Sequence, residues 1–171
     1  MFKKILCATD LNDGSSEAVK KAVHLAHQFN AQIIMLNIHE EFMTKEEMGM
    51  LRVSIDTMKS EFEKTALKAK KEMREEIKSL HAEDIQVEYI IRDGKPNKVI
   101  CEEAEKAQAD LIIMGVNDKS VSNIIFRSTA SFVIEHVKIP VLVVPMKKNN
   151  VLTLNCIFRR YRRKLQSYVR N

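Results

Sequence analysis

Apolar residues form five short runs along the chain, and the stretches between these runs carry apolar residues at every third or fourth position. Short continuous apolar runs are typical of strands buried on both faces of a parallel sheet, whereas the wider spacing is typical of amphipathic helices. The chain is therefore predicted to alternate between strands and helices. The five predicted strands are Lys3–Asp10, Ala31–His39, Ile85–Ile91, Asp110–Gly115 and Val141–Val144.

Turn and capping residues place helices between these strands. A helix is expected after the turn that begins at Asn12, with helically spaced apolar residues from Ala18 onward and with Asn30 at its end. Another is expected from Pro96, because proline suits the first position of a helix, and a further one over 120–137. Since crossovers between parallel strands are right-handed, this order predicts an α/β fold: a doubly wound, five-stranded parallel sheet with helices on both faces.

The longest predicted helix covers residues 44–81. It opens with a capping-box pattern at Thr44–Glu47, and its apolar residues then recur every three or four positions among many Lys and Glu residues. Thirty helical residues would span roughly 45 Å, whereas a strand of six residues covers about 20 Å. The helix is therefore expected to overhang the sheet or to break near Gly49. An overhang could pack against a partner, or the segment could simply be a long crossover.

The charges divide the chain into two parts. Residues 146–171 carry eight of the 28 basic residues and no acidic one, which leaves 20 basic against 23 acidic residues elsewhere, a net charge of −3. We predict one α/β domain over 1–146 and a basic tail over 147–171, in which Asn155–Val169 can form an amphipathic helix. The tail is expected to contact polyanions or an anionic membrane surface weakly, or to dock on the acidic domain or a partner subunit. Sequence-specific recognition of nucleic acid is not expected.

The start of the chain favours a cytoplasmic protein. No apolar run approaches the roughly 20 residues that span a bilayer. The N-terminal segment turns polar at Thr9, which is too early for a signal peptide.

Neither a catalytic nor a metal site is expected. His24 and His27 lie three positions apart on a predicted helix, but no third ligand is evident. Cys7, Cys101 and Cys156 match no zinc or disulfide framework, and the first two fall at apolar positions. No Ser or Cys has a recognisable base and orienting partner, and no complete phosphate-binding P-loop is present. The sequence therefore predicts a protein that is not an enzyme, or at most a slow nucleotide hydrolase.

Several segments, taken together, resemble the universal stress protein family. They are Lys3–Asp10, Met35–His39, Gly94–Pro96, Ala109–Gly115 and Pro140–Val144, and they span nearly all of residues 1–145. The resemblance implies a flavodoxin-like sheet with strand order 3-2-1-4-5, in which the first and fourth strands are neighbours. A crevice is expected at the carboxyl ends of these strands, where Asp10, His39 and Gly115 would converge.

ATP-binding members of the family carry a glycine pattern after the fourth strand: Gly, two residues, Gly, nine residues, Gly, then Ser or Thr. Glycines let backbone amides approach phosphates closely. Gly115 matches the first position, but Asp118 stands at the second, where its carboxylate would cost on the order of 3 kcal/mol at about 5 Å from a phosphate charge. Asp118 could instead turn inward and cap the next helix. The loop more closely resembles the branch that does not bind ATP.

No cofactor is certain, and ATP is the candidate that the resemblance implies. The final Ser or Thr of the pattern falls at Ser128–Thr129, or at Arg127–Ser128 if one residue is deleted. Asp10 would lie near the ribose or cap the next turn, and Ile38 would lie beside the adenine. Gly115 would admit phosphates or serve the turn alone. The candidate nucleotide contacts are Ala8, Thr9, Asp10, Ile38, Met114, Gly115, Asp118, Arg127, Ser128 and Thr129.

The resemblance also implies a homodimer and a role in stress tolerance. The two subunits would pair along the edge of the fifth strand, at Val141, Leu142, Val143 and Val144, because a bare apolar edge strand needs a cover. The leading hypothesis is a non-catalytic binding and interaction module. The alternative is an ATP sensor whose occupancy alters partner binding.

Overall fold

The computed structural model describes residues 1–40, 54–116 and 127–145. Within these residues, strands and helices alternate as predicted. The elements are β1 (Lys4–Thr9), α1 (Asp13–Phe29), β2 (Gln32–His39), α3 (Ile55–Ser79), β3 (Val87–Asp93), α4 (Pro96–Lys106), β4 (Leu111–Val116), α5 (Arg127–His136) and β5 (Val141–Pro145).

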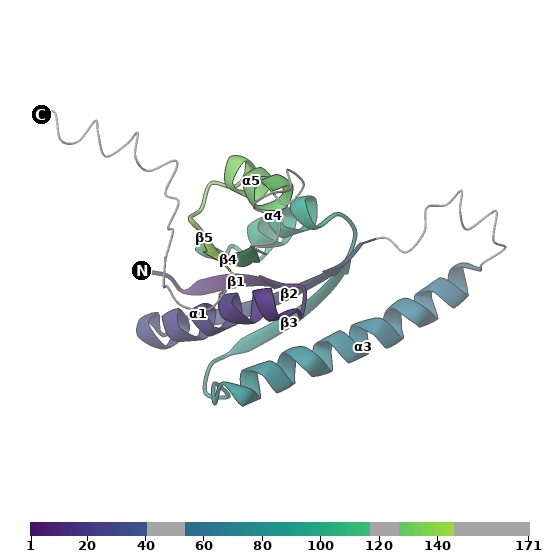
Figure 1. The fold of residues 1–171 in the computed structure, drawn as a ribbon, viewed down its shortest axis with the longest axis horizontal. Helices are drawn as coiled ribbons and strands as arrows, with labels where there is room; N and C mark the ends of the chain where they lie inside the picture. The colour runs from purple at the N-terminus through teal and green to yellow at the C-terminus, as the bar shows by residue number, and fades with distance from the viewer. Residues whose placement is uncertain (41–53, 117–126, 146–171) are drawn as a thin grey trace, which may run out of the picture.

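The strands form one parallel sheet with the order β3-β2-β1-β4-β5 (Figure 1), which confirms the predicted fold class. The strand β1 lies at the centre, where Ala8 pairs with Leu36 of β2 on one side and with Met114 of β4 on the other. The strands β3 and β5 form the two outer edges. The carboxyl ends of all five strands therefore lie along one side of the sheet.

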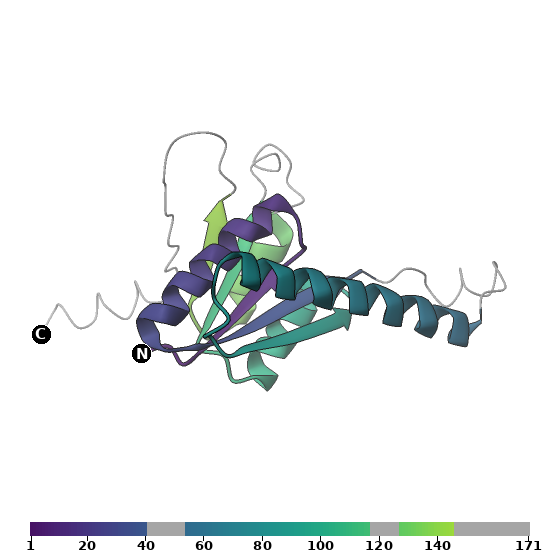
Figure 2. The same ribbon diagram turned by 90° about the horizontal axis from the view of Figure 1, so that it is seen from below.

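Helices cover both faces of this sheet, α1 and α3 on one and α4 and α5 on the other (Figures 1 and 2). The central strands are buried on both sides: Ile33, Ile34, Met35 and Leu36 are each at most 1% exposed. This explains why they read as an unbroken apolar run. Cys7 is fully buried in the core under α1, as its apolar position predicted.

Local hydrogen bonds explain one correct prediction, the end of α1, and one wrong prediction, the start of β3. Asn30 adopts a left-handed backbone with φ of 50° and donates its N–H to the carbonyl of Ala26, so it closes α1 as predicted. The predicted third strand began at Ile85, two residues too early. Ile85 donates its N–H to the carbonyl of Ala82, so this apolar residue belongs to the preceding turn.

The long helix was predicted over residues 44–81, either overhanging the sheet or broken near Gly49, and in the structure α3 begins at Ile55. Ser54 has an extended backbone, and its hydroxyl accepts the N–H of Thr57, so α3 starts with its own N-cap. The expected capping box at Thr44–Glu47 and the break near Gly49 lie outside the described residues, as does the part of the helix predicted over 120–126.

The predicted overhang of α3 is confirmed. Its C-terminal half packs on the sheet through Ala69, Met73 and Ile77, each at most 3% exposed. Its N-terminal half projects past the ends of the strands (Figure 2), and Leu67 is 70% exposed. No helix among the described residues has the length and apolar character that crossing a membrane requires.

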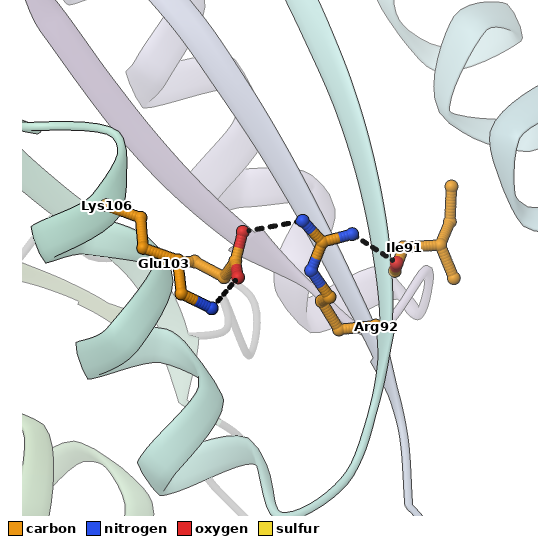
Figure 3. Close-up of polar contacts among 4 residues, drawn as sticks. All are labelled: Ile91, Arg92, Glu103 and Lys106. Carbon is orange, nitrogen blue, oxygen red and sulfur yellow. Dashed lines mark hydrogen bonds and ion pairs between the residues drawn. The ribbon is translucent and has the colours of Figure 1, made fainter.

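An ion-pair cluster joins the edge strand β3 to α4 (Figure 3). The carboxylate of Glu103, only 4% exposed, accepts hydrogen bonds at 3.0 Å from Nη2 of Arg92 and at 3.0 Å from Nζ of Lys106. Burial disfavours the charge on this carboxylate, but the two cationic donors outweigh burial and lower the pKa of Glu103. The buried charge is therefore compensated, and it ties the strand to the helix.

Candidate functional site

The site forms where β1 and β4 end. These strands are parallel neighbours, and β5 continues the sheet beyond β4, with Gly115 paired to Val144. The helix that follows β1 lies on one face, and the helix that precedes β5 lies on the other. A pocket of about 360 Å³ opens at this point, and both Asp10 and Gly115 line it. In doubly wound sheets, ligands bind in a crevice of this kind. It lies at the carboxyl ends of two neighbouring strands whose following helices lie on opposite faces of the sheet.

Most of the predicted contacts border the pocket. The predicted residues that line it are Ala8, Thr9, Asp10, Ile38, Met114, Gly115 and Thr129. Asp118 lies outside the described residues, and the side chains of Arg127 and Ser128 at the start of α5 are not described. That these residues contact a nucleotide stays a prediction.

His39 was expected at the mouth of the crevice, but it does not line the pocket. Successive side chains of a strand point to opposite faces, so Ile38 faces the pocket and His39 faces α3. The His39 ring meets the edge of the Phe62 ring there, with 6.4 Å between the ring centres. The strand periodicity alone could have excluded His39.

Gly115 lies within β4, one residue before its end, and not at the bend after the strand. Gly115 lines the pocket while it pairs with Val144 inside the sheet. The interpretation that Gly115 serves only a turn is therefore not supported.

The sequence analysis missed several residues that complete the pocket. They are Asn12, Ser15, Leu36, Glu40, Pro96, Ile100, Val116 and Ala130. Leu36 could have been found, because it shares a strand face with Ile38. Pro96 and Ile100 come from the first turns of α4, and only the packing of this helix over β2 brings them to the crevice.

A hydrogen-bond network holds the loop between β1 and α1. The hydroxyl of Thr9, which is 5% exposed, bonds to the Ser15 hydroxyl at 2.9 Å and accepts the Leu11 N–H at 3.1 Å. The Ser15 hydroxyl donates to the carbonyl of Asn12 at 2.9 Å, and the Asn37 side chain donates to the carbonyl of Thr9 at 2.9 Å. This network fixes the polar wall of the pocket in place before any ligand arrives.

Asp10 stabilises the turn after β1, which is one of its two predicted roles, and it also borders the pocket. One oxygen of its carboxylate accepts the Asn12 N–H at 3.1 Å, so it stabilises the turn. The residue is also exposed and lines the pocket. Among the lining residues that the structure describes, Asp10 and Glu40 are the charged ones, and both are acidic. The described part of the pocket therefore disfavours ligands with several negative charges.

The described residues offer little for chemistry in this crevice. Burial raises the pKa of the Cys7 thiol and of the Cys101 thiol, and nearby glutamates add to the effect, so neither is an activated nucleophile. His27 lies at the far end of α1 from the crevice, where its Nε2 contacts the Asp84 carboxylate at 3.1 Å. Within residues 1–40, 54–116 and 127–145, no group of three His, Cys, Asp or Glu side chains could hold a metal ion.

Comparison with known proteins identifies the family to which the chain belongs. The family model described as "Universal stress protein family" matches residues 1–145. Universal stress protein MJ0531 of Methanocaldococcus jannaschii is 32% identical over 151 residues, with 86% of this chain and 85% of the relative covered.

Two solved structures share the fold. Hypothetical protein MJ0577, from the same archaeon, superposes with a TM-score of 0.68 and 27% identity, over 88% of this chain and 99% of that one. A universal stress protein in complex with cAMP superposes with a TM-score of 0.60 and 22% identity, over 85% of this chain and 98% of that one.

The parallel sheet defines a doubly wound α/β protein, with a pocket at the carboxyl ends of its central strands. Within that class, the chain belongs to the universal stress protein family.

Proposed function

We propose that this chain is a non-catalytic binding module of the stress response, and that its crevice holds an adenine nucleotide with few phosphate charges. The observation that carries the proposal is the pocket of about 360 Å³ at the carboxyl ends of β1 and β4, lined by the positions where the family resemblance places the nucleotide. Its volume is within the range of sites for small molecules.

The two walls of the pocket suit the two parts of a nucleoside. Ile38 and Val116, both half-buried, supply apolar surface for a planar base. Asp10, which is exposed at the end of β1, supplies a carboxylate acceptor for ribose hydroxyls. The similar universal stress protein in complex with cAMP supports this class of ligand, because its fold superposes over 85% of this chain.

Charge favours a nucleotide with one phosphate over ATP. Asp10 and Glu40 would repel a triphosphate. Asp118, which the sequence resemblance places at a glycine position of the phosphate-binding pattern and which lies outside the described residues, carries a further negative charge. The sequence offered an ATP sensor as the alternative hypothesis. In its place we propose a sensor of an adenine nucleotide that carries fewer charges than ATP. The chain would act through occupancy of the crevice and not through turnover.

Equilibrium dialysis with labelled cAMP, AMP and ATP tests this proposal. Replacement of Ile38 by Ala removes apolar contact in the pocket and should weaken cAMP binding about tenfold. Leu67→Ala removes an exposed side chain on α3 and serves as the control, with unchanged binding. No binding of any of the three nucleotides at millimolar concentration would refute the proposal and leave a module that acts through protein contacts alone.

The remaining expectations are also proposals. A homodimer would pair the β5 edges, since Val141, Leu142 and Val143 are only half-buried at the outer edge of the sheet. The basic tail over 147–171, which lies outside the described residues, would make weak contacts with polyanions or an anionic membrane surface. A cytoplasmic location remains the expectation from the sequence.

A further inference from the structure

The opposite edge of the sheet carries an apolar groove. No other strand among the described residues pairs with the outer side of β3, so its outward backbone groups have no strand partner, although the Ile91 carbonyl accepts a hydrogen bond from Nη1 of Arg92 at 3.2 Å. Beside this edge, a groove of about 600 Å³ separates β3 from the overhanging half of α3, and Phe62, Ala66 and Leu67 line it. Apart from Met1 at the chain end, Leu67 is the only large hydrophobic side chain exposed among the described residues. An edge of this kind requires a cover.

The sequence of β3 is complementary to itself in the antiparallel direction. If two copies of Val87–Asp93 pair with Ile90 at the centre, each Glu88 lies directly opposite the partner's Arg92. Opposed residues of an antiparallel pair project to the same face, so these opposite charges come together twice. Pairing centred on Glu88 or on Arg92 would instead bring like charges together, which selects the register at Ile90.

Both charged side chains are placed for such contacts. Glu88, Ile90 and Arg92 alternate along β3 on the face that α4 covers, because Ile90 packs in the core there and Arg92 bonds to Glu103 of α4 (Figure 3). The Arg92 side chain is still 47% exposed, and Glu88 is exposed. The guanidinium has five N–H donors, and one of them now donates to the Ile91 carbonyl at 3.2 Å. When the partner strand takes over that carbonyl, Arg92 can keep Glu103 and donate to a second carboxylate.

We propose that β3 pairs with β3 of a second copy of this chain about a twofold axis at Ile90, and that the groove beside α3 is part of that interface. The axis is perpendicular to the sheet, so both α3 helices would lie on the same face, with Leu67 covered between them. The complementary charges of Glu88 and Arg92 identify the second copy as the occupant. This interface lies at the opposite edge from β5 and leaves the crevice open.

Disulfide trapping tests the pairing and its register. Glu88→Cys and Arg92→Cys are made as separate proteins, both with Cys101→Ser and Cys156→Ser. Directly opposed residues have Cα atoms about 4.5 to 5.5 Å apart, within reach of a disulfide. Oxidation of the mixture should give a covalent dimer that neither protein gives alone. Absence of this dimer, or equal cross-linking in the separate proteins, would overturn the proposal.

Two further measurements keep the test decisive. If Arg92→Cys does not fold, Ile90→Cys on the axis should cross-link to its own copy, and its failure to do so would equally refute the pairing. Glu88→Arg in the otherwise native chain should weaken self-association about tenfold by sedimentation, because it places like charges opposite each other twice. Glu83→Arg, an exposed change of the same charge before β3, is the matched control. Unchanged association of Glu88→Arg would contradict the proposal, as would an equal loss in the control.

Discussion

Asp10 and Gly115 line the same pocket, although one follows the first strand of the chain and the other lies near the end of the fourth. They meet because β1 and β4 are parallel neighbours with Ala8 beside Met114. The carboxylate of Asp10 and the backbone of Gly115 therefore border one pocket. The charge of that carboxylate has a direct consequence for ligand choice.

Removal of the acidic charges at the pocket should raise the affinity for ATP. The double variant Asp10→Asn with Glu40→Gln keeps the size of both side chains and the acceptor that binds the Asn12 N–H. We expect ATP to bind about tenfold more tightly, since both groups are exposed and their repulsion is screened by water, whereas cAMP should change less. Equilibrium dialysis of both nucleotides measures the difference. Glu83→Gln, away from the pocket, is the control, and an ATP affinity equal to that of the native protein would contradict the proposed role of these charges.

The buried carboxylate of Glu103 should make stability depend on pH. Its pKa is lowered in the folded protein, so its ionised form stabilises the fold above the unfolded value of 4.5, and this contribution is lost as the pH falls through the folded pKa. Glu103→Gln should therefore lower the free energy of unfolding by about 1–2 kcal/mol at neutral pH. The difference from the native protein should shrink in acid.

Urea denaturation at neutral pH and through the acid range measures this effect. Glu105→Gln changes an exposed glutamate of the same helix and should have little influence at either pH. An equal loss for Glu103→Gln at both ends of the range would show that the ionised carboxylate is not what stabilises the junction of β3 and α4.

Asp110 should anchor the start of the chain. One oxygen of its carboxylate accepts the N–H of Lys3 at 2.8 Å and that of Lys4 at 3.0 Å, and these bonds lower its pKa. Asp110→Ala should cost about 1–3 kcal/mol of unfolding free energy, because two backbone donors lose their acceptor, and Asp110→Asn should recover part of the loss. Thermal unfolding monitors both variants beside Asp84→Asn, an exposed control. Equal stability of the Ala and Asn variants would contradict the role of the acceptor.

The β5 edge should govern dimerisation if the family's mode of pairing holds here. Val143→Lys places a charge on a half-buried residue of the outer strand, and we expect it to shift the sedimentation profile toward monomer. A salt-independent shift is expected, because the edge is apolar. Gln28→Lys, at an exposed residue of α1 outside both edge strands, is the control, and an equal shift in both variants would argue against a specific β5 interface.

Much of the fold could be predicted from local sequence because each buried strand is an unbroken apolar run. The errors arose where an apolar residue was used differently, as at Ile85 in a turn. Glu103 could not be recognised, since a glutamate among Glu102, Glu105 and Lys106 reads as part of a solvated helix face. Its burial depends on Arg92, a partner from another element.

The site residues that could be predicted are those that a local sequence signal marks. Asp10 and Gly115 follow from strand ends and from the family resemblance, so the sequence could place them. Glu40, Pro96 and Ile100 reach the pocket from a strand end and from a helix, and their convergence depends on how α4 packs against the sheet. Tertiary packing of this kind leaves no local signature in the sequence.

Photolabelling with an azido derivative of cAMP, followed by peptide mapping, shows directly whether the crevice binds a nucleotide. We expect label in peptides that contain the end of β1, the end of β2 or the first turns of α4, and we expect excess unlabelled cAMP to remove this label. Label confined to the groove between α3 and β3, or label that cAMP does not displace, would contradict the claim that the crevice is the nucleotide site.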